Sequence, residues 1–371
     1  MRVAGDTLYL GDADRGLWAL SLADPAHPAW EGDRVELAAS ARDLVAAGER
    51  IYISAFSSYG LQILDRGLNT LGVYRTLYHP YNVIWQGDLA YVFDRGVGLQ
   101  VVSTTGVPAV IGTAEFEAPY GHLRLALDGG TAFAAANDLQ NGRALLYAVD
   151  VSDPAAPAVA ARTETPFIQS LAAADGYLYA AACEQGVLIY NAGLALLGEL
   201  PSQGCSDSLL VDGNYLYLGD GAGGLAVFDL GDPAQPREIA RHPWPFELPL
   251  RPVMVAADGV LYVAYDASAV GRDLPSLLVF DTSILAEITP AGSLTEPRMR
   301  AAAVQVENGR LYVADQNGWL YVFDLSNPLS PSLTAKNQSS GGEFYDLAVQ
   351  GSRFLVTAGG GGMYLYEASH E

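Results

Sequence analysis

The sequence predicts an all-β protein, a single β-propeller of four-stranded blades that spans residues 1–371. Three observations lead to this prediction. A unit of four strand-like segments recurs along the whole chain, with an average spacing of about 43 residues, which matches a propeller blade. The segments are rich in β-branched and aromatic residues and are separated by turn residues. No stretch has a convincing helical period, so we expect almost no helix.

One unit shows the four expected strands most clearly. Strand A covers residues 208–211, strand B residues 216–218 and strand C residues 224–229, and strand D begins after Pro236. Nine segments of B type begin along the chain, at Leu8, Ile51, Ala90, Ala132, Leu178, Leu216, Leu261, Leu311 and Phe354. We therefore count nine units. Because roughly four to eight blades is the usual range, an eight-bladed ring is the alternative.

The connections between these segments have two recurring signatures. The A–B hairpins carry Asp-Gly or Asn-Gly pairs, which tolerate the positive φ angles of two-residue turns: Asp175-Gly176, Asp212-Gly213, Asp258-Gly259 and Asn308-Gly309. The C–D loops carry Asp-Pro or Asn-Pro pairs, at Asp24-Pro25, Asp153-Pro154, Asp232-Pro233 and Asn327-Pro328. Since these acidic residues recur in the same loop, we assign them to turns rather than to catalysis.

The repeated unit resembles a known family. Its pattern Gly-Leu-x-Val-Phe-Asp-Leu-x-Asp-Pro-x-x-Pro is similar to the LVIVD repeat of bacterial and archaeal propeller proteins, most closely in the sixth unit. The second unit departs from it at Asp65-Arg66-Gly67, and the fifth at Tyr190-Asn191-Ala192-Gly193. The resemblance covers essentially the whole chain. It implies a propeller that is commonly exported or displayed on the cell surface, and it implies no catalytic residue, because the motif itself is structural.

The composition excludes two classes of partner. The formal net charge is −22, from 42 acidic and 20 basic residues, whereas binding to nucleic acid requires clustered Lys and Arg. No apolar run of about 18 residues occurs, so we expect no membrane insertion. No signal peptide is visible in residues 1–10, which lead almost directly into a repeat. We expect a monomer or a part of a larger surface protein.

Strand direction places the B–C and D–A loops on one face of a propeller, where the variable loops can hold a ligand. Seven polar residues on this face are the ligand-binding candidates: His79, Tyr81, Asp94, Tyr120, His122, Arg251 and Arg300. Because His79 and His122 occupy equivalent places in neighbouring units, they and Asp94 could bind a transition metal or share a proton. The carboxylates of the rim would suit Ca²⁺. The alternative is a rim that is polar only because it is wet.

The two cysteines fall on this same face. Cys183 ends a B segment and Cys205 precedes the next A segment, so they lie in adjacent blades. A disulfide between them would fit an oxidising compartment. The sequence gives no distance, however, and both the disulfide and two free thiols stay open. The spacing of the cysteines excludes a zinc finger.

These observations predict a non-catalytic binding or scaffold propeller. It would be extracellular, periplasmic or on the cell surface by resemblance, and would bind a protein, a glycan or a small ligand on the B–C and D–A loops. The alternative is a metal-dependent hydrolase or lyase with its site at the channel mouth. A third reading is a structural segment of a longer surface protein. The chain contains no nucleophile elbow, phosphate loop or His-Glu-x-x-His motif, so no catalytic residue is predicted.

Overall fold

The structure is a computed structural model that divides into two compact units, Met1–Tyr78 and His79–Glu371, which are described separately. It describes residues 2–4, 6–11, 16–32, 35–37, 41–47, 50–55, 61–74, 79–105, 108–117, 123–244, 252–266, 275–285, 288–296, 299–338, 343–351, 353–358 and 362–367.

The first unit consists of two antiparallel sheets. In the first sheet β1 (Arg2–Ala4), β2 (Thr7–Gly11) and β3 (Gly16–Ser21) follow one another, and β3 also pairs with β4 (Ala29–Trp30) and β5 (Val35–Glu36). The second sheet is β6 (Ala41–Ala47), β7 (Arg50–Ala55), β8 (Leu61–Asp65) and β9 (Thr70–Tyr74). Tyr9, Leu17, Ile51, Ile53 and Leu64 are buried together in one core.

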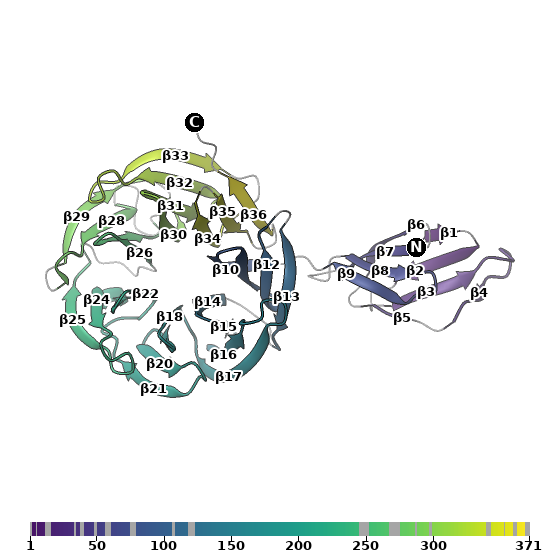
Figure 1. The fold of residues 1–371 in the computed structure, drawn as a ribbon, viewed down its shortest axis with the longest axis horizontal. Helices are drawn as coiled ribbons and strands as arrows, with labels where there is room; N and C mark the ends of the chain where they lie inside the picture. Colours follow the sequence, from purple (N-terminus) through teal and green to yellow (C-terminus); the bar gives the residue numbers. More distant parts are fainter. Residues whose placement is uncertain are drawn as a thin grey trace. The chain divides into compact units, whose positions relative to one another are not determined.

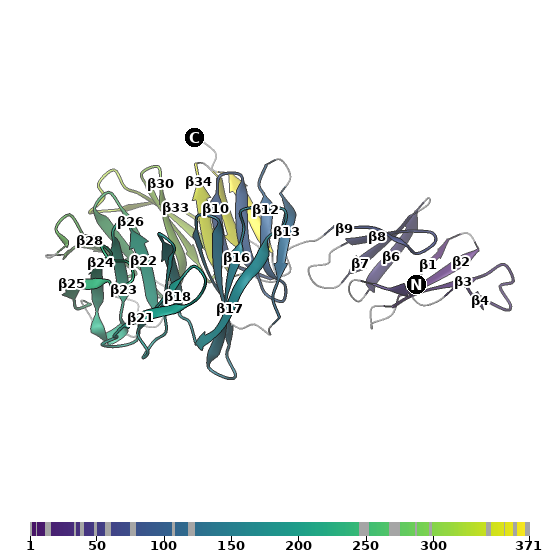
Figure 2. The ribbon, with the colours of Figure 1, turned by 60° about the horizontal axis from the view of Figure 1, so that its bottom comes forward.

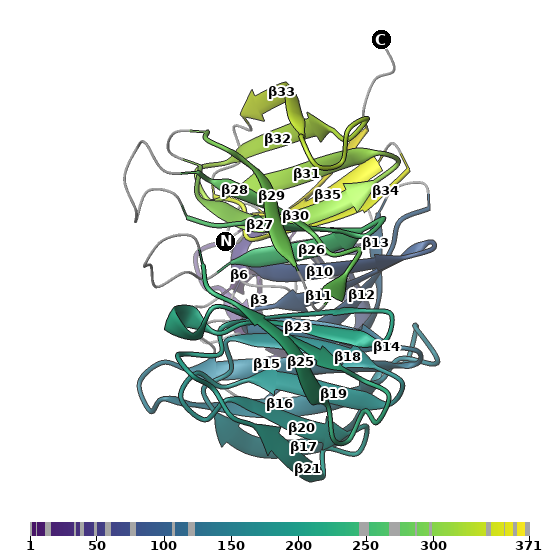
Figure 3. The same cartoon turned by 90° about the vertical axis from the view of Figure 1, so that its left-hand side faces the viewer.

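The second unit is a ring of seven antiparallel sheets, each with its first strand innermost (Figure 1). Figures 2 and 3 show this ring from two further sides. The sheets are β10 (Pro80–Gln86), β11 (Leu89–Asp94), β12 (Gly98–Ser103) and β13 (Ala109–Glu115); β14 (Leu123–Asp128), β15 (Thr131–Asp138), β16 (Arg143–Asp150) and β17 (Ala158–Pro166); β18 (Ser170–Ala174), β19 (Tyr177–Ala181), β20 (Val187–Asn191) and β21 (Leu196–Leu200); β22 (Ser208–Asp212), β23 (Tyr215–Gly219), β24 (Leu225–Asp229) and β25 (Arg237–His242); β26 (Val253–Ala257), β27 (Val260–Ala264), β28 (Leu277–Asp281) and β29 (Thr289–Leu294); β30 (Ala301–Glu307), β31 (Arg310–Asp315), β32 (Trp319–Asp324) and β33 (Ser332–Gln338); and β34 (Asp346–Gln350), β35 (Arg353–Thr357) and β36 (Met363–Glu367).

The ring closes where the first strand β10 lies beside β34 of the seventh sheet (Figure 1). An Asp346 carboxylate oxygen accepts a hydrogen bond from the Val83 N–H at 2.9 Å, and the Thr357 hydroxyl donates to the Tyr81 carbonyl at 2.9 Å. The nine expected sheets are present. The prediction that they form one propeller of nine or eight blades over residues 1–371 is not confirmed. Seven sheets share the ring, because this contact closes it without the first two repeats.

Three of the four predicted A–B turns have the expected angles, whereas Asp212 is the last residue of β22 and does not have a positive φ. Asp175, Asp258 and Asn308 have φ angles of 54°, 51° and 50°, and each is followed by a glycine that also has a positive φ. In the C–D loops, the side chains of Asp153 and Asp232 accept hydrogen bonds from backbone N–H groups two residues later, at 3.0 and 3.1 Å. The aspartates are therefore structural. Helix is scarce, as predicted: the described residues contain only the 3-10 turn Gly221–Gly223, and none of their helices could span a membrane.

Three C–D loops of the ring, which contain Pro154, Pro233 and Pro328, dock on the preceding blade. The Tyr179 hydroxyl donates to the Pro233 carbonyl at 2.9 Å, and the Tyr262 hydroxyl donates to the Pro328 carbonyl at the same distance. The loop also approaches strand D closely: a Cβ atom added to Gly112 would lie 2.2 Å from the Pro154 carbonyl oxygen. The proline loop of one blade thus contacts the preceding blade at two places. It accepts a hydrogen bond from a strand B tyrosine, and it packs closely against a small residue of strand D.

Candidate functional site

A cavity of about 460 Å³ lies in the channel of the ring. Residues from the first strand of all seven sheets line it. Because the strands of each sheet alternate in direction, the D–A and B–C loops surround one mouth of this channel. This is the face that the sequence analysis selected for binding.

Two of the predicted residues, His79 and Tyr81, lie together at this mouth. Their rings are stacked, with centroids 5.2 Å apart, and the ring of Tyr345 lies 4.5 Å from that of Tyr81. The Tyr345 hydroxyl donates to Glu343 at 3.0 Å. Burial, followed by the Glu343 carboxylate, raises the pKa of Tyr345 to about 12, and burial lowers the pKa of His79. Tyr81, Glu343 and Tyr345 all line the cavity.

The seven ligand-binding candidates did not include Glu343 and Tyr345. Both lie just before the first strand of their sheet, as His79 does before β10. That position in the repeat was the available signal for them. Only ring closure brings Tyr345 next to Tyr81, so their proximity could not be found from local sequence.

Asp94, by contrast, is fully buried. Its two carboxylate oxygens accept hydrogen bonds from the His79 N–H, each at 3.1 Å. Asp220 follows the second strand of its sheet, and Asp315 ends the second strand of another. In the same manner, their carboxylates accept hydrogen bonds from the backbone N–H groups of Gln203 and Arg300. Asp94, a ligand-binding candidate of the sequence analysis, therefore fixes the loop that leads into the first strand.

The remaining candidates are not brought to the cavity by the described structure. The Arg300 guanidinium donates to Asp266 at 3.1 Å, and Arg300 does not line the cavity. Tyr120, His122 and Arg251 lie outside the described residues, so the predicted group of His79, His122 and Asp94 stays a prediction. Within the described ranges, no group of three or more His, Cys, Asp or Glu residues could hold a metal ion.

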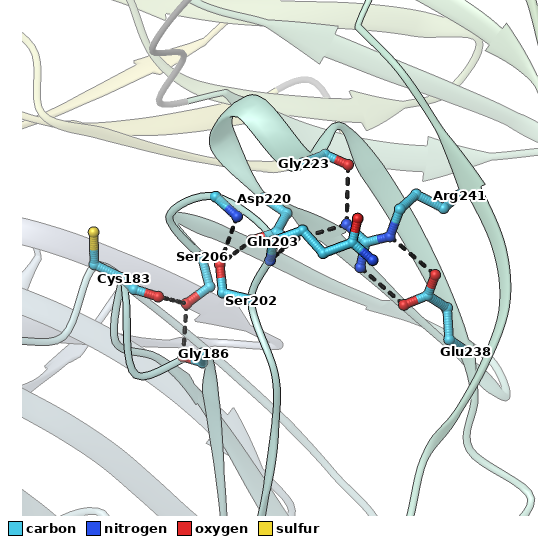
Figure 4. Close-up of polar contacts among 10 residues, drawn as sticks. Cys183, Gly186, Ser202, Gln203, Ser206, Asp220, Gly223, Glu238 and Arg241 are labelled. Carbon is cyan, nitrogen blue, oxygen red and sulfur yellow. Dashed lines mark hydrogen bonds and ion pairs between the residues drawn. The ribbon is translucent and has the colours of Figure 1, made fainter.

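A buried ion-pair network supports the same face at the fourth sheet (Figure 4). Asp220 is fully buried and accepts from the Gln203 N–H and from Arg241 Nη1, each at 2.8 Å, and from the Ser202 hydroxyl. Arg241 also donates to the Gly223 carbonyl at 2.9 Å and forms a two-point ion pair with Glu238. Its bonds to Glu238 and Asp220 raise the pKa of Arg241, against the effect of burial.

The disulfide between Cys183 and Cys205 is formed in the structure, with a Cα–Cα distance of 4.0 Å. It joins the B–C loop of the third ring sheet to the loop before β22. The Ser206 hydroxyl lies between the same loops and donates to the carbonyls of Cys183 and Gly186, at 3.0 and 2.6 Å (Figure 4). Of the two states that the sequence left open, the structure has the disulfide, which connects two adjacent blades on this face of the ring.

We expect the double substitution Cys183→Ser and Cys205→Ser to lower the free energy of unfolding by about 2–3 kcal/mol, because it frees a loop in the unfolded chain. Urea titration of the oxidised protein and the double variant measures this difference. Dithiothreitol should lower the stability of the parent to that of the variant. An unchanged midpoint in both comparisons would contradict the expectation.

Asp346 connects the cavity to the ring closure. It lines the cavity, and its carboxylate accepts hydrogen bonds from the N–H groups of Val83 and Leu347, each at 2.9 Å. Burial raises the pKa of Asp346 to about 6. The folded state therefore favours the protonated carboxyl group more strongly than the unfolded state does.

This shift predicts a pH dependence of stability. Because the folded-state pKa is raised, the Asp346 contribution falls as the pH rises from about 4 to about 6 and stays low above that range. We expect a loss of about 1–2 kcal/mol, since part of the side chain is open to the channel. Asp346→Asn cannot ionise, so the difference in unfolding free energy between parent and variant should change by this amount between pH 4 and pH 7. Parallel pH profiles in urea titrations would rule the effect out.

Comparison with known proteins agrees with the repeat analysis. The LVIVD repeat model matches residues 134–165, 203–242 and 300–337. The chain carries LVIVD repeats. The matched LVIVD segments include the buried Asp220 and Asp315, whereas Tyr81, Glu343 and Tyr345 lie outside them. The residues of the channel mouth are therefore not part of the matched repeats.

Solved structures similar to this LVIVD-repeat chain are propellers. BamB from Moraxella catarrhalis shares 14% identity at a TM-score of 0.53, over 88% of this chain and 96% of its own. The periplasmic gluconolactonase PpgL of Pseudomonas aeruginosa shares 17% at 0.59, over 77% and 94%. The WD40 β-propeller domain of Doa1 shares 10% at 0.58, over 79% and 94%. At these identities the similarity shows the fold alone. No curated protein sequence matches the chain.

Proposed function

We propose that this LVIVD-repeat chain is a non-catalytic binding propeller whose ligand occupies the mouth of the ring channel. The observation that carries the proposal is the cavity of about 460 Å³ with Tyr81, Tyr345 and Glu343 in its wall. Its volume falls within the roughly 300–1,000 Å³ of small-molecule sites. Aromatic faces beside a carboxylate can hold a small ligand, the end of a glycan or a protein side chain.

We further propose that the protein functions outside the cytoplasm. The Cys183–Cys205 disulfide supports this location, because disulfides persist in oxidising compartments. PpgL is named a periplasmic protein, which is compatible with the same location. Its lactonase activity does not transfer, since a shared fold does not imply a shared site. No observation favours the metal-dependent hydrolase or lyase, so we do not develop that alternative.

Thermal-shift titrations test the binding site. A panel of neutral sugars, amino acids and small organic acids is added to the parent protein and to Tyr81→Ala, Tyr345→Ala and Tyr177→Ala. Tyr177 begins β19, at the opposite face of the ring, and is the matched control. A compound that stabilises the parent should lose its effect in the first two variants and keep it in the third.

Two results would overturn the proposal. If a stabilising compound acts equally on the parent and on both channel variants, the ligand binds elsewhere. If no compound of the panel stabilises the parent, the cavity is not a site for these ligand classes.

A further inference from the structure

The charged residues that line the channel cavity are mostly acidic. In the described part of the chain, one cationic and three acidic residues line it: Arg124, Asp207, Glu343 and Asp346. Arg124 has acceptors within the chain, because its Nη1 donates to the Leu123 carbonyl at 2.7 Å and its Nε donates to the Gln169 carbonyl. Burial raises the pKa of Asp346, and the charge of Arg124 acts against this increase. The described wall of the cavity therefore carries an excess of negative charge.

Two aromatic rings lie beside one of these carboxylates. The rings of Tyr81 and Tyr345 both line the cavity, with their centroids 4.5 Å apart and their planes tilted by 49°. Glu343 accepts a hydrogen bond from the Tyr345 hydroxyl, so the carboxylate and the ring are held together. The face of an aromatic ring attracts a cation, and the attraction grows when the cation is desolvated. The wall thus combines the two kinds of group that recognise an organic cation.

The chain holds its own single lysine ammonium with the same set of groups. Lys336 is the only lysine of the sequence. Its Nζ atom lies 4.8 Å from the ring centroid of Trp319 and 4.7 Å from that of Tyr321. The same Nζ atom donates to the carboxylate of Glu296. Two aromatic rings and one glutamate therefore bind an ammonium group in this fold, and the channel mouth contains a second set of two rings and a glutamate.

We propose that the channel ligand is a small organic molecule with an ammonium group, which lies against the rings of Tyr81 and Tyr345 and forms an ion pair with Glu343. This inference rests on the proposed binding function and adds the charge of the ligand. A methylated ammonium group suits these walls better than a metal ion, because its methyl groups can contact ring faces, whereas Ca²⁺ needs about six to eight oxygen ligands. The net charge of −22 would attract such a ligand towards the protein.

Isothermal titration calorimetry of the full chain with two matched compounds tests the proposal. Choline carries a trimethylammonium group, and its uncharged isostere dimethylbutanol has a tert-butyl group in the same place. At low ionic strength we expect choline to bind at least about tenfold more tightly than the isostere. Because Glu343 is exposed, sodium chloride at about 0.5 M should screen its charge, weaken choline binding and leave binding of the isostere nearly unchanged.

Three protein variants locate the charge and the site. Glu343→Gln keeps the size of the side chain and removes its charge, so it should weaken choline binding by about tenfold and leave the isostere nearly unaffected. Asp88→Asn is the matched control and should bind choline as the parent does. It makes the same change in net charge in the turn between β10 and β11, at the opposite mouth of the channel. Tyr345→Ala removes a ring from the site and should weaken the binding of both compounds.

Failure of the ammonium proposal can be told apart from failure of the proposed function. Equal binding of choline and its isostere would overturn the ammonium proposal, and so would the absence of choline binding at about 10 mM. Equal losses in Glu343→Gln and Asp88→Asn would assign the effect to net charge alone and would overturn it too. The proposed function still stands if a neutral or acidic compound binds to the parent and loses its binding in Tyr345→Ala. Choline binding that Glu343→Gln and Tyr345→Ala leave unchanged would place the cation elsewhere and contradict the proposal.

Discussion

Replacing Asp220 by alanine should lower the free energy of unfolding by about 3–5 kcal/mol, the largest effect expected for a single side chain here. The substitution removes a fully buried carboxylate that accepts from Gln203, Ser202 and Arg241. It leaves the Gln203 N–H without its acceptor and Arg241, which is only 16% exposed, without its buried partner. Urea unfolding followed by tryptophan fluorescence measures the loss.

Glu238→Gln is the matched control, because it changes the other carboxylate bonded to Arg241. The Glu238 side chain is 37% exposed. Ion pairs at this exposure contribute about 1 kcal/mol or less, so the control should be nearly as stable as the parent. Equal losses in both variants would show that burial of Asp220 is not what makes its ion pair important.

Gly112→Ala should destabilise the protein by about 3 kcal/mol, because its new Cβ atom would lie 2.2 Å from the Pro154 carbonyl oxygen and 2.7 Å from Pro157. The backbone of two neighbouring blades would have to separate to admit a single methyl group. Thermal and urea unfolding of the variant measure this cost.

Gly198 is the matched control, since it occupies the same place in the strand pairing of another blade. A Cβ atom there would lie 3.8 Å from the nearest atom, the Ala234 carbonyl oxygen. Gly198→Ala should therefore be neutral or slightly stabilising, because alanine restricts the unfolded chain. If both alanine variants lost the same stability, the close approach of the Pro154 loop would not be the cause.

The sequence allowed the strands and turns to be predicted, because both are determined by neighbouring residues. Asp258-Gly259 and Asn308-Gly309 adopt the expected positive φ angles. The number of repeats in one ring was not predictable in this way. It depends on the contact of Asp346 with Val83, two residues that lie 263 positions apart.

In the candidate site too, features set by neighbouring residues could be predicted, and features set by distant contacts could not. His79 and Tyr81 are close in sequence, and the structure places both at the channel mouth. Asp94 was interpreted as an exposed rim carboxylate because a sequence shows charge but not burial. Tyr345 joins the site from the seventh sheet, through the closure of the ring.

Where a proline loop docks on the preceding blade, the two blades carry complementary contact groups. One blade supplies Tyr179 as a receptor, the next supplies the Pro233 carbonyl, and another pair repeats the contact with Tyr262 and Pro328. A gene that duplicates or deletes one repeat therefore leaves complementary surfaces on both sides of the change. Recombination between two such repeats would keep these contacts, so the array could change in length at the interfaces that carry them.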